Sequence, residues 1–420
     1  MTDDELRQAA TQQLRANDRD GVTVPSPSLY PHQWNWDSAF AAIGRSTFDP
    51  PRALTELERL LEGAWASGMV PHILFDPEVQ GYEPGPRWWR TAGNARRPSS
   101  SITQPPVAAT ALLRVLERGG WSADLVQRAR PLLPVLEGWH CWFSRERDPR
   151  GEGLPAIVHP WESGMDNAPL WDGPLSRVPR DMGFTRRDVE LVDADQRPVQ
   201  EHYERYAYLV RLNADRGFTP PDDAWPFLVQ DPVLLALLLQ AERDLLQICR
   251  TVGQSTEAAA RAARIQQAME RKLLDPATGR FRHWDLVADR PLEVEGLFGY
   301  LPLYAGLGGE LLVQALRQAL SDPDQLGAPY TVPTMFLGSP RFERRRYWRG
   351  PCWVNTNWML IQGLRRLGVD DLAHELRQAT LRLVRHAGFW EYFDPLTGAG
   401  LGAEQFSWSA ALALDLLHTG

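Results

Sequence analysis

The chain is poor in cysteine and lysine and carries no excess of positive charge. Its 420 residues include three cysteines, Cys141, Cys249 and Cys352, and a single lysine, Lys272. An odd cysteine number in a long chain argues against a disulfide framework and predicts core thiols in a reducing compartment, so we expect a cytoplasmic location. The formal net charge of -8 provides no basic field for phosphates, so we expect no nucleic-acid partner.

Membrane, metal and nucleotide signals are also missing. No uninterrupted apolar run approaches the roughly 20 residues that span a bilayer, and the acidic start MTDDELRQAA does not resemble a secretory signal. His374-Glu375 lacks a second histidine four residues after the first, and no CxxC pair or histidine cluster suggests a metal. Since no Gly-rich loop follows a strand, we expect neither a bound cofactor nor a metal.

Tryptophan, by contrast, is abundant, with 17 residues, many of them in loops beside glycine, proline and polar residues. The faces of tryptophan rings suit the C–H surfaces of sugars, while the indole N–H donates to hydroxyls. For any single tryptophan, burial in the core is the more frequent role. The tryptophans that flank acids in loops are the candidates for ligand binding.

Apolar residues recur at helical spacing from end to end, with little strict alternation. The clearest helix follows Asp231-Pro232, a capping residue and a first-turn proline. With it, about twelve helices are expected, the others over Asp3 to Asn17, Trp36 to Arg45, Arg52 to Ala66, Pro105 to Arg118, Ala123 to Arg145, Val199 to Ala214, Thr256 to Leu274, Gly309 to Leu320, Cys352 to Leu367, Asp370 to His386 and Gln405 to Leu417.

This helix pattern favours six helical hairpins closed into a ring, an all-α (α/α)6 toroid. No repeat of roughly 33 to 45 residues supports a tetratricopeptide or ankyrin array. No long linker or charge run divides the chain, so residues 1–420 are predicted to form a single domain. Long segments separate some helices, over Val70 to Thr103, Gly151 to Gln196 and Asp322 to Gly350. Loops of this length usually serve a site.

Acidic residues in two aromatic-rich segments are candidates for proton transfer. In HPWESGMDNAP, Glu162 and Asp166 lie near Trp161, whose apolar surface would favour a neutral carboxyl, although Asp-Asn near glycine is also good turn chemistry. Near the C-terminus, Glu391 lies between two aromatic residues, while Glu404 precedes a helix and is equally suited to a first-turn role. Spacing alone does not rank Glu391 above Glu404.

Six motifs rich in aromatic and polar residues span nearly the whole chain. They are YPHQWNWDSAF (residues 30–40), SITQPPV (101–107), HPWESGMDNAP (159–169), DQRPVQEHYERY (195–206), YWRGPCW (347–353) and EYFDPLTG (391–398). In sequence and in order these motifs resemble glycoside hydrolase family 63, and in particular its short bacterial members that hydrolyse mannosylglycerate and glucosylglycerate.

The resemblance implies an (α/α)6 catalytic domain that inverts the anomeric carbon. It assigns Asp166 as the general acid and Glu391 as the general base. Inverting chemistry needs one acid to protonate the departing oxygen and one carboxylate to activate water on the opposite face, with the carboxyl groups about 6.5 to 9.5 Å apart.

The resemblance also implies substrate contacts. Asp37 would bind a sugar hydroxyl, although a first-turn helix acid is its plainer role. Arg197 and Tyr203 would grip the carboxylate of a glycerate aglycone as a guanidinium fork with one added phenol donor, unless Arg197 only pairs with a neighbouring acid. Phe406 stands where such relatives carry a glutamine, which puts one contact in doubt. The other implied contacts are Tyr30, Trp34, Trp36, Tyr82, Gln104, Trp161, Gly164 and Trp348.

The expected activity is hydrolysis of 2-O-α-mannosyl-D-glycerate, and of the glucosyl analogue, a compatible solute, to hexose and D-glycerate. A trehalase-like or other α-glucosidase on the same fold is the alternative within the class. Two alternatives belong to other classes. One is a sugar epimerase or isomerase, which would use histidines as acid and base, and the other is an inactive helical scaffold. The expected partner is a small-molecule substrate, with a homo-oligomer left open.

Overall fold

A closed ring of inner helices forms the centre of the computed structural model, which describes residues 1–92, 97–184, 186–293 and 295–419. Each inner helix packs against the next, and the last packs against the first. In order they are α2 (Asn35–Arg45), α5 (Ala108–Arg118), α10 (Pro232–Val252), the 3-10 helix η6 (Leu297–Ala305), α13 (Val354–Arg366) and α15 (Ser407–His418).

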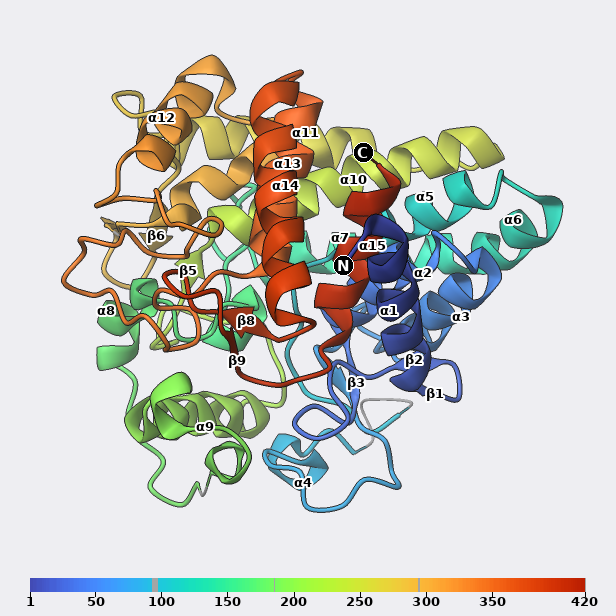
Figure 1. Ribbon diagram of the computed structural model, residues 1–420. Coiled ribbons are helices and arrows are strands. Elements are labelled where there is room, and N and C mark those ends of the chain that lie inside the picture. The colour runs from blue at the N-terminus through green and yellow to red at the C-terminus, as the bar shows by residue number, and fades with distance from the viewer. Residues whose placement is uncertain (93–96, 185, 294, 420) are drawn as a thin grey trace.

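An outer layer of helices covers this ring, and inner and outer helices alternate along the chain (Figure 1). The alternation confirms the predicted (α/α)6 toroid. The outer helices, each with its inner neighbour, are α1 (Asp3–Ala16) on α15, α3 (Pro50–Leu61) on α2 and α5, α7 (Leu133–Glu146) and α11 (Ala258–Lys272) on α10, α12 (Gly309–Ser321) on η6, and α14 (Asp370–Ala387) on α13.

Local sequence explains where the helices begin and end. Asp231 caps α10 by accepting a hydrogen bond from the backbone N–H of Val233 at 2.9 Å, and Pro232 occupies the first turn. Gly253 ends the helix in the left-handed conformation, with φ of 70°. The leucines of α10 are buried on nearly every side because the helix lies between the ring's interior and α11.

The structure corrects the predicted helices in three places. The inner helix η6 was missed because its sequence, LFGYLPLYA, is apolar on all faces and contains Pro302, so it lacks the expected amphipathic pattern. The helix predicted over Val199 to Ala214 exists as α9 (Gln200–Asp215), but it packs on α4 (Pro86–Trp89) outside the ring (Figure 1). The segment Ala123 to Arg145 divides at Pro131 into α6 (Ala123–Ala129), the 3-10 turn η1 (Arg130–Leu132) and α7.

Short antiparallel strands join the connecting loops. β3 (Gln33–Trp34) pairs with β4 (Ile73–Leu74), and β8 (Tyr392–Phe393) with β9 (Gly400–Leu401). β1 (Asp18–Arg19) pairs with β2 (Val22–Thr23), and β6 (His283–Asp285) lies between β5 (Val229–Gln230) and β7 (Arg290–Leu292). The loop from 151 to 196 is folded into short turns, namely η2 (Pro160–Ser163), η3 (Pro169–Trp171), α8 (Asp172–Ser176), η4 (Asp188–Glu190) and η5 (Ala194–Gln196).

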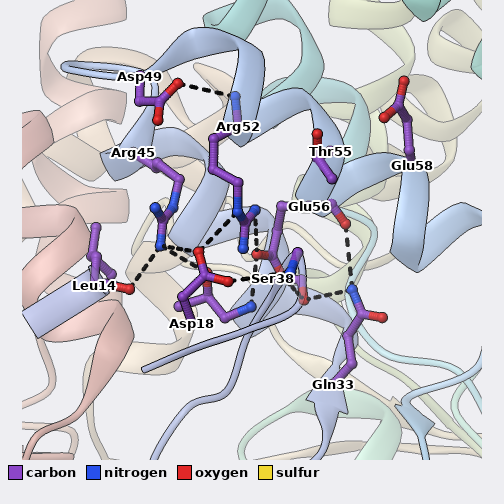
Figure 2. A network of polar contacts seen from close by, with 12 residues as sticks. Leu14, Asp18, Gln33, Ser38, Arg45, Asp49, Arg52, Thr55, Glu56 and Glu58 are labelled. Carbon is purple, nitrogen blue, oxygen red and sulfur yellow. Dashed lines mark hydrogen bonds and ion pairs between the residues drawn. The ribbon is translucent and has the colours of Figure 1, made fainter. Parts of the chain in front are cut away.

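A polar network fixes the first turn of α2 against α3 (Figure 2). The buried carboxylate of Glu56 accepts hydrogen bonds from Ser38 Oγ at 2.8 Å and from Arg52 Nη1 at 3.2 Å. Asp18 pairs with Arg45 at 3.2 Å and with Arg52 at 2.9 Å. Every member of such a buried network needs its partners, so the network holds the start of α2 in one position.

The three cysteines form no disulfide. Cys249 and Cys352 are buried, as predicted for core thiols, whereas Cys141 is only partly buried. Across the described residues, no helix combines the length and apolar character that a membrane crossing requires. Within the same residues, no group of three or more histidine, cysteine or acidic side chains is placed to hold a metal ion.

Candidate active site

A cavity of about 290 Å³ lies where α2 and α15 begin, walled by the long loops. Twelve of the thirteen residues expected at the site line this cavity. They are Tyr30, Trp34, Trp36, Asp37, Tyr82, Gln104, Trp161, Gly164, Asp166, Arg197, Tyr203 and Glu391. The structure therefore brings together segments that lie up to 361 residues apart in the chain.

Trp348 is the predicted residue that does not line the cavity. Its ring stacks on Trp353 with centroids 3.7 Å apart and lies 6.4 Å from Trp36, behind the cavity wall. The neighbouring residue Tyr347 lines the cavity instead, with its hydroxyl 3.4 Å from that of Tyr30. Trp348 thus supports the wall of the cavity, and Tyr347 forms part of it.

Asp166 follows the η2 turn and the left-handed Gly164, and its backbone carbonyl accepts a hydrogen bond from Tyr206 Oη at 2.6 Å. Burial raises the pKa of the Asp166 carboxyl to about 7, against the opposing charge of Arg197. A carboxyl with this pKa holds its proton over much of the neutral range and can donate it. The desolvated environment expected beside Trp161 is present.

Glu391 immediately precedes β8, and both of its carboxylate oxygens are hydrogen bonded. Oε1 accepts from Tyr30 Oη at 2.8 Å and lies 3.6 Å from Arg197 Nη1, while Oε2 accepts from the backbone N–H of Ala403 at 3.0 Å. Burial raises the pKa of Glu391, and the charge of Arg197 and these hydrogen bonds oppose the rise. The carboxylate therefore keeps a fixed orientation toward the cavity.

The two competing acids lie elsewhere. Glu162 is buried away from the cavity, where it accepts hydrogen bonds from Arg147 Nη2 and the backbone N–H of Val158, both at 2.8 Å. Glu404 is exposed on the loop before α15. Asp37 does line the cavity, and burial and the charge of Glu391 raise its pKa well above the ordinary value. Geometry thus separates Asp166 and Glu391 from Glu162 and Glu404, which spacing alone did not.

Arg197 is buried with 4% of its surface exposed, so it is not a surface ion pair, although it does pair with an acid. Its Nε donates to Asp188 Oδ2 at 3.1 Å and its Nη1 to Tyr30 Oη at 2.8 Å. Tyr203 Oη also donates to Asp188 Oδ2, at 2.9 Å. Arg197 therefore connects the neighbourhood of Glu391 with the η4 turn.

Sequence reasoning missed several cavity residues. Tyr347 and Trp408 lie within or beside the aromatic motifs, and their aromatic character was the available signal. Arg186 and Asp188 lie in a polar loop without a distinguishing pattern, so nothing in the sequence marked them. Phe406 lines the cavity with its ring 5.9 Å from that of Tyr30, so an apolar surface stands where a polar contact was in doubt.

Gly164 permits close contact between the η2 turn and Trp36. A Cβ at this position would meet the Trp36 ring at 2.5 Å, and the backbone φ of 71° further disfavours a side chain. We expect Gly164→Ala to displace Trp36, to raise KM, and to lower stability by about 1–3 kcal/mol. Steady-state kinetics and thermal denaturation measure both effects. Gly173→Ala is the matched control, because a Cβ there meets nothing within 4 Å; equal behaviour of the two variants would contradict the prediction.

The helical ring and its carboxylate-bearing, aromatic-lined cavity are typical of a glycoside hydrolase. The model of the mannosylglycerate hydrolase MGH1-like glycoside hydrolase domain matches residues 30–409. The chain belongs to this family. Membership of this family identifies the chain as a glycosidase. It therefore rules out the sugar epimerase or isomerase and the inactive helical scaffold.

Individual relatives agree over nearly the whole chain. A mannosylglycerate hydrolase from Rubrobacter radiotolerans is 40% identical over 95% of this chain and 93% of its own length. A glucosylglycerate hydrolase from Mycolicibacterium hassiacum is 35% identical over 99% of this chain and 98% of its own length. The crystal structure of a family 63 mannosylglycerate hydrolase from Thermus thermophilus with Tris and D-glycerate superimposes with a TM-score of 0.91 at 42% identity, covering 98% of this chain and 99% of that one. The resemblance to family 63 is thereby confirmed.

Proposed function

We propose that this chain hydrolyses 2-O-α-mannosyl-D-glycerate and 2-O-α-glucosyl-D-glycerate, with inversion, to free hexose and D-glycerate. The observation that carries the proposal is the placement of Asp166 and Glu391 on one buried cavity, in a chain whose relatives include hydrolases of both substrates. Inversion needs a proton donor and a water-activating base on the same cavity.

In the proposed reaction, Asp166 donates its proton to the glycosidic oxygen as the bond to the anomeric carbon breaks. Glu391 accepts a proton from the water that attacks this carbon from the opposite face. Tyr30 and Arg197 favour the ionised form of Glu391 through a 2.8 Å hydrogen bond and a 3.6 Å ion pair. The proposed reaction requires Asp166 to enter protonated and Glu391 to enter ionised.

The remaining residues serve the two halves of the substrate. We propose that Trp34, Trp36 and Trp161 pack on the sugar ring. Asp37 and Gln104 would bind its hydroxyls, and the Gln104 carbonyl oxygen, which accepts from the Trp36 backbone N–H at 3.3 Å, orients the free amide group. Tyr82, Arg197 and Tyr203 would hold the glycerate, whose carboxylate suits a guanidinium and phenol donor set.

The anomer first released tests the inversion. We expect β-hexose as the initial product, seen by proton NMR within the first turnovers, before mutarotation mixes the anomers. Release of α-hexose would overturn the mechanism. Parallel assays with trehalose and with neutral α-glucosides test the substrate assignment, which predicts much lower kcat/KM for both.

The single-domain organisation of residues 1–420 and a cytoplasmic location stay predictions. Whether the protein forms a homo-oligomer stays open. Size-exclusion chromatography with light scattering measures the oligomeric state directly.

A further inference from the structure

The donors proposed for the substrate carboxylate already hold a carboxylate from the chain itself. Asp188 Oδ2 accepts hydrogen bonds from Tyr203 Oη at 2.9 Å and from Arg197 Nε at 3.1 Å. Arg186 adds a two-point contact, with Nη2 2.7 Å from Oδ2 and Nε 2.9 Å from Oδ1. Asp188, Arg186, Arg197 and Tyr203 all line the cavity, so this contact lies inside the proposed site.

Because the hydrogen-bond donors of Arg186, Arg197 and Tyr203 already bind Asp188, few of them remain free to bind a second carboxylate. A phenol has one proton to donate, and that of Tyr203 goes to Asp188. Burial would raise the pKa of Asp188, but the hydrogen bonds and charges of Arg186 and Arg197 lower it to about 2, so the group is ionised at neutral pH. A substrate carboxylate entering beside it would therefore meet a like charge on the cavity wall and would compete with it for Arg186, Arg197 and Tyr203.

Apart from the contacts of Asp188, few contacts hold the turn η4 in place. None of the η4 residues is buried. The apolar side chains Val189, within the turn, and Leu191, directly after it, are 39% and 60% exposed, so neither holds the turn against the core. A segment with few buried apolar contacts rearranges at low cost. The contacts of Asp188 with the two arginines and the tyrosine thus attach η4 to the cavity wall, and Val192, just after the turn, packs against the core.

We propose that Asp188 is a specificity-determining residue that fills the carboxylate subsite of the free enzyme and is exchanged for the carboxylate of an anionic aglycone. An anionic aglycone replaces one negative charge by another, so Arg186 and Arg197 stay paired throughout. A neutral aglycone offers no replacement, so Asp188 stays in place and fills the subsite. The inference rests on the proposed function in taking the aglycone to be a carboxylate.

Isothermal titration of the full chain with D-glycerate tests the exchange. In Asp188→Asn, the amide occupies the same place without the charge, so D-glycerate no longer competes with an ionised group. We expect its Kd to fall by about tenfold relative to the wild type. We expect glycerol, the neutral analogue, to bind with unchanged affinity.

Two further variants serve as controls. Glu78→Gln removes an exposed charge from a loop position outside the cavity lining, so we expect its Kd for D-glycerate to change less than about twofold. Asp188→Glu keeps the charge and should bind D-glycerate no more tightly than the wild type. Far-UV circular dichroism checks that each variant is folded.

Weaker or unchanged binding of D-glycerate by Asp188→Asn would overturn the proposed exchange. It would show instead that Asp188 positions Arg197 and Tyr203. Absence of D-glycerate binding by the wild type would also overturn it. Hydrolysis of the two glycerate glycosides is measured separately on the same wild-type sample. The proposed function fails only if that hydrolysis is absent, so the two failures are distinguishable.

Discussion

Asp166→Asn is expected to lower kcat for the glycerate glycosides by about 10³-fold, because an amide cannot supply a proton to the departing oxygen. The side chain keeps its shape, so the melting temperature should stay close to that of the wild type. Steady-state kinetics and thermal denaturation of the purified variant provide the two measurements. Turnover near the wild-type rate would remove Asp166 from the role of general acid.

The protonation state of Asp166 adds a pH test of the same assignment. The acid form is the active one, and the pKa of Asp166 in the empty cavity is about 7, so wild-type kcat/KM should decline as the pH rises through this region. A substrate with fluoride as leaving group needs little protonation, so Asp166→Asn should retain much of the wild-type rate with α-mannosyl fluoride. That rate should no longer decline at the alkaline side.

Glu391→Gln is expected to lower kcat by a similar factor, about 10³-fold, since the amide cannot take a proton from the attacking water. Here α-mannosyl fluoride should not restore activity, because the water still needs a base whatever the leaving group. Opposite responses to the fluoride thus separate the acid from the base. Glu404→Gln is the control, an exposed acid of the same C-terminal region whose loss should leave kcat unchanged. Rescue of Glu391→Gln by the fluoride would contradict its assignment as the base.

The fold was predictable wherever a helix has one apolar face. Helices such as α1 and α14 present a stripe to the ring and solvent on the other side, and their predicted bounds agree with the structure to within about one residue. The inner helix η6 has no polar face and contains Pro302, so neither periodicity nor propensity marked it. The helix α9 has ordinary periodicity, but periodicity does not say whether a helix joins the ring or packs over the cavity.

Sequence allowed the residues of the candidate site to be predicted where they belong to the family's motifs. Asp166 and Glu391 could be named from the family resemblance, whereas local spacing left Glu162 and Glu404 as equals. Their separation is a tertiary effect, since the partners that hold the buried Glu162 include Arg147, from the end of α7, and the backbone N–H of Thr103. Asp188 could not be found at all, because its importance depends on two arginines and a tyrosine that the fold brings to one carboxylate.

The closure of the ring by α15 has a consequence for the order in which the molecule gains its activity during synthesis. Glu391, the proposed base, and the cavity-lining residues Phe406 and Trp408 leave the ribosome after all other residues of the cavity lining. Because α15 must dock between α2 and α13, the nascent chain keeps an open bundle until residues 407–418 emerge. The ring, and with it the complete cavity, therefore cannot close before α15 has been synthesised.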